Sequence, residues 1–151
     1  MKKFTRNDII LLQDFVNSID NEITIAKSDR FECDIEEKQI FVCSKEIDNL
    51  DLQFIEWFKK QPEYTFINVI LLSFLHEIGH IMTYEKERND NRAVIESMLV
   101  FMNEQNAITE KEMNFAYWDL DAERLATMWG VKYFKNNRQK CLELAAAIGL
   151  C

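Results

Sequence analysis

Apolar residues recur three or four positions apart over most of the chain, which is the spacing of one face of an α-helix. The first such segment begins with Thr5 and Asn7, either of which can cap a helix. The most apolar segment follows Pro62, which ends the helix before it. The pattern predicts helices over residues 5–20, 50–60, 64–84, 93–103, 109–136 and 141–148.

The period changes between residues 23 and 43, where three short runs of β-favouring residues are separated by polar, turn-like breaks. The runs cover residues 23–28, 30–35 and 38–43. They predict a small antiparallel sheet that precedes the most apolar helix. The chain is therefore expected to have an α+β fold that is mostly helical.

Two further expectations concern where the helices of the second half begin and end. The segment 85–92 is polar throughout and is predicted to be a loop. Thr109, with Glu112 three residues later, matches a capping box. It predicts the start of a helix that continues to Asn136.

Length and composition indicate one domain over residues 1–151, because 48% of the residues are apolar and no segment resembles a linker. Asp and Glu number 26 against 18 Lys and Arg, so the net charge of -8 repels nucleic acid and anionic membranes. The sequence has neither an export signal nor a run of about 20 apolar residues that could span a membrane. A cytoplasmic location is expected.

The four cysteines, Cys33, Cys43, Cys141 and Cys151, have no Cys-x-x-Cys spacing. A cytosolic chain with a sizeable core does not need disulfides, so four free thiols are expected. The alternative is that Cys33 and Cys43 face each other across a hairpin, as a disulfide or as a second metal site.

Both histidines of the chain, His76 and His80, lie four positions apart in the most apolar predicted helix. Residues at this spacing project from one face of a helix, so both rings can direct a nitrogen at one metal ion. Glu77 is rotated by about 100° from His76, which places it beside the ion, where it can take a proton from a water molecule. The alternative is a pair of hydrogen-bonded core histidines, but ionisable groups in an apolar helix are costly unless they are paired or bind a metal.

Catalytic zinc usually has three protein ligands, and since no further histidine exists, the third must be a carboxylate or a thiolate. One predicted helix offers Asp119, Asp121 and Glu123. Asp121 lies about 200° from Glu123 around that helix, so these two cannot serve one ion. Glu123 is favoured because it shares a helix face with Thr127 and Asp119 and because its neighbours are small. Asp119 stays an alternative.

Small residues recur at four-residue spacing in the same predicted helix, at Ala122, Ala126 and Gly130. Gly79 lies between the two histidines of the apolar helix. Because small residues let helix backbones approach closely, the two helices are expected to pack together. The alternative is ordinary helix packing unrelated to a site.

The run His76-Glu77-Ile78-Gly79-His80 resembles the active-site helix of zincin metallopeptidases. Residues 123–130, Glu-Arg-Leu-Ala-Thr-Met-Trp-Gly, resemble the Glu-x-x-Ala-[Asp/Asn]-x-x-[Ala/Gly] helix of the gluzincin type, in which the glutamate is the third metal ligand. Trp129 stands where the ImmA/IrrE-like family, repressor-cleaving peptidases of mobile elements, has Phe or Trp. Thr127 departs from the pattern, because it replaces the Asp or Asn that braces a metal-binding histidine; Thr127 itself or Asp119 can take that task.

The resemblance implies a zincin-like domain that binds Zn2+ through His76, His80 and Glu123 and hydrolyses peptide bonds with Glu77 as general base. Its substrate would be a protein or peptide, such as a regulator. Such a site also needs a donor for the oxyanion, and the tyrosine candidates are Tyr84, Tyr117 and Tyr133.

Two alternatives belong to other functional classes. A catalytically silent zincin-like domain would be a protein-binding regulatory module that uses zinc only for stability, although the presence of Glu77 disfavours it. A helical regulatory module without metal would recognise its partner through its acidic surface. Metal analysis separates the second alternative from the others, and the activity of Glu77→Gln separates the peptidase from the silent domain.

Overall fold

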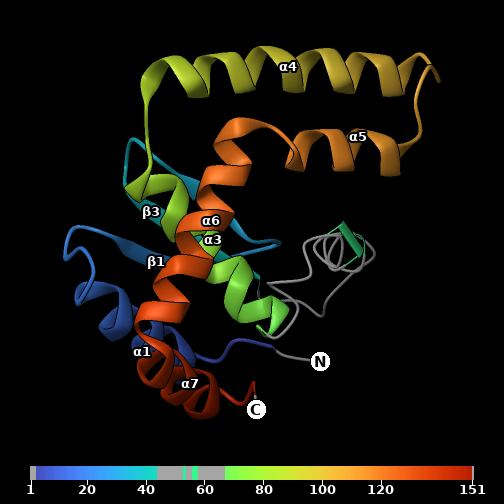
Figure 1. Ribbon diagram of the computed structural model, residues 1–151. Helices are drawn as coiled ribbons and strands as arrows, with labels where there is room; N and C mark the ends of the chain where they lie inside the picture. The colour runs from blue at the N-terminus through green and yellow to red at the C-terminus, as the bar shows by residue number, and fades with distance from the viewer. Residues whose placement is uncertain (1–2, 44–52, 54–55, 58–66, 151) are drawn as a thin grey trace.

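The computed structural model describes residues 3–43, 53, 56–57 and 67–150 (Figure 1). The chain is mostly helical, and a three-stranded sheet precedes most of the helices, so the predicted α+β class is confirmed. The helix predicted over 50–60 lies almost wholly outside the described residues. The elements are α1 (Arg6–Asn17), β1 (Thr24–Ser28), β2 (Glu32–Asp34), β3 (Gln39–Cys43), α3 (Val69–Met82), α4 (Lys86–Glu104), α5 (Glu110–Trp118), α6 (Asp121–Asn136) and α7 (Arg138–Ala147).

Helix α1 begins at a capping box formed by Thr5 and Asp8. The backbone N–H of Asp8 donates to Oγ1 of Thr5 over 3.1 Å, and the backbone N–H of Thr5 donates to Oδ2 of Asp8 over 2.7 Å. Thr5, not Asn7, is therefore the cap. The helix buries Leu12, Phe15 and Val16 on one face, as its apolar spacing predicts.

The sheet is mixed, so the prediction of an antiparallel sheet is wrong for one of its two strand pairs. The strand order is β1-β3-β2; β2 pairs antiparallel with β3, whereas β1 runs parallel to β3. Alternation along a strand shows which face is buried, but it does not specify the neighbour or the direction of pairing.

The strand register separates the two cysteines of the sheet. Cys33 pairs with Ile40, and Cys43 pairs with Ser28 on the opposite strand, so the two do not face each other across the hairpin. Cys33 and Cys141 are free thiols, as expected.

Helices α3 and α6 cross at very short range in the middle of the molecule (Figure 1). A Cβ atom placed on Gly79 of α3 would lie 2.3 Å from the carbonyl oxygen of Ala126 in α6. A Cβ on Gly130 would lie 3.1 Å from Cβ of Leu75. The small-residue stripe therefore allows the close approach that the sequence predicts.

Residues 85–92 are not the predicted loop. Helix α4 begins at Lys86 and runs to Glu104, along the top of Figure 1, where it packs on α5 and α6. The segment is polar but contains no Gly or Pro, and Glu, Lys and Arg favour helix. The structure describes every residue of α4, and none of them is buried. A helix that buries no residue can be polar throughout, and for this reason the polar composition of residues 85–92 did not indicate a loop.

The predicted helix over 109–136 is two helices, although its start at the Thr109–Glu112 capping box is confirmed. Helix α5 ends at Trp118, and Leu120 has extended backbone angles (φ -64°, ψ 146°) before α6 begins at Asp121. Oδ1 of Asp119 accepts a hydrogen bond of 3.0 Å from the indole of Trp57. Since no Gly or Pro marks this break, the apolar spacing did not predict it.

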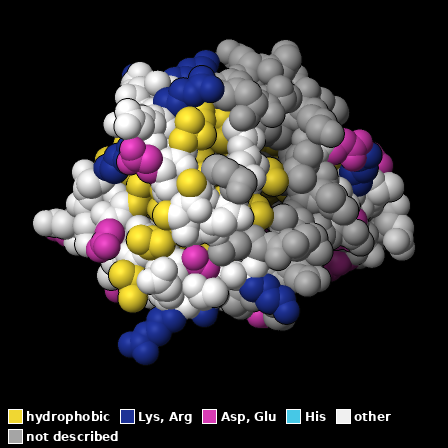
Figure 2. All heavy atoms as spheres, turned by 90° about the horizontal axis from the view of Figure 1, so that it is seen from below, with side chains coloured by type: hydrophobic (Ala, Val, Ile, Leu, Met, Phe, Trp, Pro, Cys, Tyr) yellow, Lys and Arg dark blue, Asp and Glu magenta, His cyan; other side chains and the backbone are white. Residues whose placement is uncertain are grey.

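The core surrounds α3, whose residues from Ile70 to Ile81 are buried except Ser73. The face seen from below in Figure 2 shows apolar, acidic and basic side chains but no histidine. No helix within the described part of the chain has both the length and the apolar character needed to cross a membrane.

Candidate metal centre

Helix α3 presents both histidines of the chain to one buried site. The helix begins at Asn68, whose side chain accepts hydrogen bonds from the backbone N–H groups of Ile70 and Leu71. His76 and His80 lie one turn apart, only 6% and 5% exposed, with their rings nearly perpendicular and their centroids 4.6 Å apart. The spacing of four therefore has the effect that the sequence predicts: both rings face the same side of the helix.

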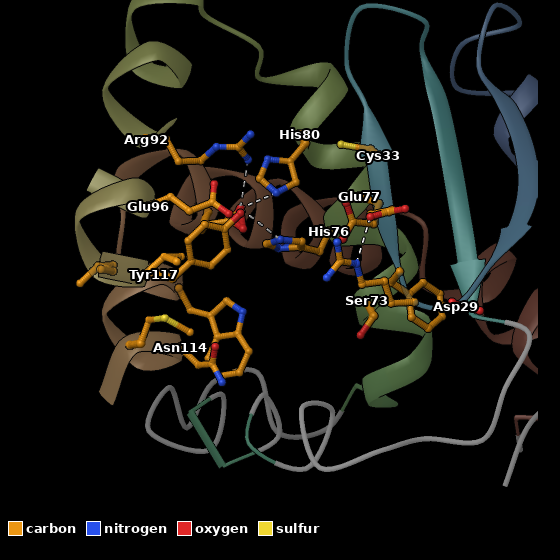
Figure 3. A pocket seen from close by; sticks show the side chains of 18 residues that line it. Asp29, Cys33, Ser73, His76, Glu77, His80, Arg92, Glu96, Asn114 and Tyr117 are labelled. Carbon is orange, nitrogen blue, oxygen red and sulfur yellow. Dashed lines mark hydrogen bonds and ion pairs between the residues drawn. The ribbon is translucent and has the colours of Figure 1, made fainter. Parts of the chain in front are cut away.

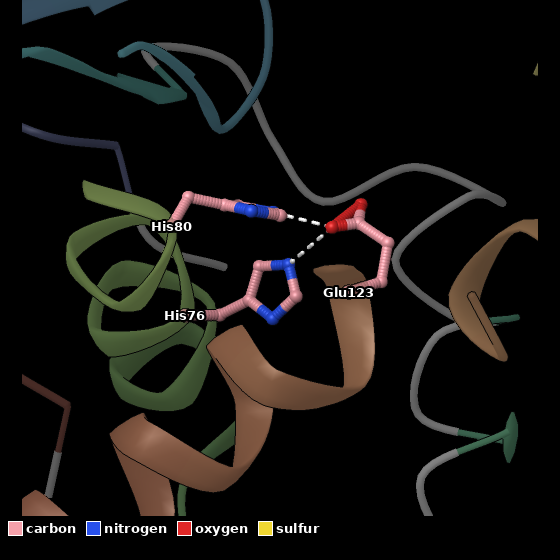
Figure 4. A group of neighbouring side chains, drawn as sticks. All are labelled: His76, His80 and Glu123. Atoms are coloured by element: carbon pink, nitrogen blue, oxygen red, sulfur yellow. Dashed lines mark ion pairs between the residues drawn. The ribbon is translucent and has the colours of Figure 1, made fainter. Parts of the chain in front are cut away.

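Glu123, in the first turn of α6, completes the group (Figure 4). Its Oε2 atom lies 3.5 Å from Nε2 of His76 and contacts Nε2 of His80. One ligand atom from each of the three residues lies within 4.8 Å of the others, so the group could hold a metal ion. The close crossing of α3 and α6 brings these side chains together.

Asp119, the alternative third ligand, is not part of this group. It caps the C-terminus of α5, and its carboxylate is engaged with Trp57. Asp119 and Glu123 lie on either side of the break before α6, so they do not share a helix face. The structure therefore places Glu123, and not Asp119, beside the histidines.

The chemistry of the group fits a cation. Nδ1 of His76 is 2.8 Å from Oγ1 of Thr127, so Thr127 has the bracing position that the sequence analysis considered. When that nitrogen carries the ring hydrogen, the lone pair of Nε2 points at the carboxylate of Glu123. Oε2 of Glu123 has no hydrogen-bond partner among the described residues. Acceptors that face one another in a buried site repel unless a cation lies between them.

Electrostatics keep the Glu123 carboxylate ionised. Burial by itself would raise its pKa, but the adjacent His80 and His76 outweigh burial and hold the pKa of Glu123 well below its usual range. For His76 burial acts to lower the pKa, and the Glu123 carboxylate reverses the effect, so the pKa of His76 is raised. The Glu123 carboxylate is therefore ionised, which is the form that can bind a metal ion.

Glu77 lies beside this group but is not one of its three members. It is 9% exposed and lines the same cavity. Burial raises the pKa of Glu77, and His76 and His80 oppose this effect only in part. Cys33 of β2 lines the same cavity, and because burial and then the Glu77 carboxylate raise the pKa of Cys33, the thiol keeps its proton. The sequence analysis did not identify Cys33 as a neighbour of Glu77, since only the register of β2 places it there.

The site opens into a cavity of about 460 Å³ between β2 and the helices α3, α4, α5 and α6 (Figure 3). Arg92 and Glu96 of α4 and Asn114 of α5 line it together with the metal group. Sequence reasoning missed Arg92 because it assigned residues 85–92 to a loop. The helical spacing of Arg92, Glu96 and Leu99 was the signal that could have identified this face.

Of the three candidate tyrosines, Tyr117 lines the cavity. Burial and then the nearby Glu123 carboxylate raise the pKa of Tyr117, so its hydroxyl stays protonated. Tyr133 stacks on Trp129, with ring centroids 5.2 Å apart. Tyr84 is 48% exposed and does not line this cavity.

Comparisons of the chain with protein-family models, with curated proteins and with solved structures gave no match. The resemblance to zincin metallopeptidases therefore rests on the residues of the two motifs and stays a prediction. The structure adds that these motifs, 47 positions apart from His76 to Glu123, lie on helices in direct contact.

Proposed function

We propose that this chain is a zinc-dependent peptidase that hydrolyses peptide bonds with Glu77 as the general base. The observation that carries the proposal is the buried group of His76, His80 and Glu123, with the carboxylate of Glu77 on the wall of the same cavity. Metal ligands and a base are the two parts that metal-assisted hydrolysis requires.

The three grouped side chains would hold the ion. Two imidazoles and one carboxylate are a usual ligand set of catalytic zinc, which keeps one position open for water or substrate. When bound, zinc would lower the pKa of a water molecule and polarise the substrate carbonyl. Thr127 fixes the orientation of the His76 ring through its hydroxyl.

Glu77 has the properties of a base in this reaction. It is buried beside the histidines, and its raised pKa makes its carboxylate a stronger base than an exposed one. It takes a proton from the attacking water and delivers that proton to the amide nitrogen as the C–N bond breaks.

The cavity suits an extended peptide. Strand β2 is the last strand in the order of the described sheet, and its residues Glu32 and Cys33 line the cavity. An extended substrate can add to such an edge through main-chain hydrogen bonds. A protein or peptide is therefore the proposed substrate class, and a regulatory protein is one example.

The test uses purified protein loaded with one equivalent of zinc and fluorescently labelled casein as substrate. Glu77→Gln should keep its metal and lose hydrolysis by about 10²- to 10⁴-fold, because an amide cannot accept the proton. Glu104→Gln, on the exposed end of α4, is the matched control and should keep its activity. Bound zinc without hydrolysis by the wild-type protein would favour a silent binding domain, and equal turnover by Glu77→Gln would make Glu77 structural.

A further inference from the structure

Arg92 of α4 extends into the cavity toward the metal group (Figure 3). Its Nη1 atom lies 3.9 Å from Oε2 of Glu123, and its side chain is 22% exposed. Its Nε atom is buried and has no hydrogen-bond partner among the described residues. A buried donor without an acceptor is costly, and such groups mark places where a ligand supplies the missing acceptor.

The ion pair with Glu123 engages Nη1 of Arg92, but the described residues offer no acceptor for its Nε atom. Because α4 buries none of its residues, it does not need the side chain of Arg92 for a core. A positive charge beside a group that could hold a cation also opposes metal binding. The charge is explained if negative charge develops in the cavity during the reaction.

Two other polar side chains on the cavity wall already have acceptors. The Ser73 hydroxyl donates to the backbone carbonyl of Val69 over 2.8 Å, and the Asn114 amide donates to the Gln53 side chain over 2.8 Å. The guanidinium of Arg92 is partly exposed in the cavity, so it can donate to an incoming anion.

We propose that Arg92 stabilises the oxyanion that forms when water adds to a peptide carbonyl in this cavity; the inference rests on the proposed function. The water oxygen bonds to the carbonyl carbon while the π electron pair of C=O moves onto its oxygen, and Glu77 holds the water's proton. Arg92 donates to the resulting O⁻. When the C–N bond breaks, the electron pair returns to C=O, and the nitrogen takes the proton from Glu77.

The first measurement separates this role from support of a metal ligand. Arg92→Met keeps the length of the apolar stem but removes the charge and the donors. We expect its zinc affinity to equal or exceed that of the wild type, because a repelling charge is lost. Weaker zinc binding by Arg92→Met in a folded protein would mean that Arg92 positions Glu123, and it would overturn the proposal.

The second measurement uses inorganic phosphate, a small oxyanion, titrated into the cobalt(II)-loaded protein and followed by visible absorption. Arg92→Met should bind phosphate about ten- to a hundredfold more weakly than the wild type, and Arg92→Lys should lie between them. Arg124→Met removes a charge from an exposed position next to Glu123 and should bind like the wild type. Equal phosphate affinity of Arg92→Met and wild type, or no phosphate binding to the wild type, would overturn the proposal.

Casein hydrolysis then distinguishes failure of this inference from failure of the proposed function. We expect Arg92→Met to lower kcat by about 10²- to 10³-fold, as loss of one oxyanion donor does, with little change in KM. If Arg92→Met hydrolyses casein as fast as the wild type, Arg92 does not stabilise the oxyanion, but the proposed peptidase function still stands. Phosphate binding that depends on Arg92, in a wild-type protein that hydrolyses nothing, would refute the peptidase and leave an anion site beside the metal.

Discussion

Nδ1 of His76, on α3, lies 2.8 Å from Oγ1 of Thr127, on α6, and both side chains are buried. This contact joins the two helices that carry the metal group. It holds the ring so that Nε2 faces Glu123. A threonine can thus occupy the position in which a carboxylate or amide would brace the ring in the family that the sequence resembles.

Loss of this contact should weaken metal binding. Thr127→Val keeps the shape of the side chain but removes the hydroxyl, and we expect its zinc affinity to fall about 10- to 100-fold, as is usual when a group that orients a ligand is removed. Competition with a chelator of known affinity measures the change. Thr127→Ser, which retains the hydroxyl, is the control and should stay close to the wild type. Equal affinity of Thr127→Val and wild type would show that Thr127 does not orient His76.

The crossing of α3 and α6 should be sensitive to a single methyl group at Gly79. A Cβ there would lie 2.3 Å from a backbone oxygen, which cannot move without a shift of the whole helix. Gly79→Ala should therefore lower the free energy of unfolding by about 1–3 kcal/mol or more, measured by urea denaturation of the metal-free protein.

Gly130→Ala is the control for that measurement. Its nearest contact is 3.1 Å, to a side-chain carbon of Leu75, so the overlap is smaller. Alanine also gains about 1 kcal/mol of helix propensity over glycine. A Gly79→Ala protein as stable as Gly130→Ala would contradict the close approach described here.

The thiol of Cys33 should influence the pH dependence of hydrolysis through Glu77. Burial raises the pKa of Glu77, and the neighbouring Cys33 thiol acts to lower it, so Cys33→Ala should raise that pKa further. A base with a higher pKa becomes protonated at higher pH, and the acid limb of the kcat/KM profile should move to higher pH. Cys33→Ser keeps a donor and should shift the profile less. An unchanged acid limb in Cys33→Ala would mean that the thiol does not act on Glu77.

Helix periodicity predicted the presence of α1, α3 and α7, because each of these helices buries apolar residues at regular spacing. The starts were less well predicted: α3 begins at Val69, after the predicted start at Tyr64, and α7 begins at Arg138, before the predicted start at Cys141. Periodicity failed for the first turns of α4, where no residue is buried and helix propensity decides. It also missed the break at Leu120, because a tertiary contact of Asp119 with Trp57 stabilises that turn. The direction of β1 depends on pairing between distant residues, which a local pattern does not contain.

The three proposed ligands could be named from the sequence, because spacing on a helix fixes which side chains share a face. Cys33 could not, since its position depends on strand register, and Arg92 was missed because its segment was predicted to be a loop. Glu123 was favoured over Asp119 for its small neighbours, and Gly79 and Ala126 show the physical basis of that choice. The prediction that Asp119 and Glu123 share a helix face was wrong, because the helix breaks between the two residues.

We expect His76, His80 and Glu123 to bind one metal ion, because their ligand atoms lie within 4.8 Å of one another. The decisive measurement is the metal content after dialysis, determined by inductively coupled plasma mass spectrometry. We expect about one equivalent per chain in the wild type and in Asp119→Ala, and a large loss in His76→Ala, His80→Ala and Glu123→Ala, because each removes one of three ligands. Unchanged metal content in the two histidine variants would show that His76 and His80 do not bind the ion. Loss of metal in Asp119→Ala but not in Glu123→Ala would show that Asp119, and not Glu123, is the third ligand.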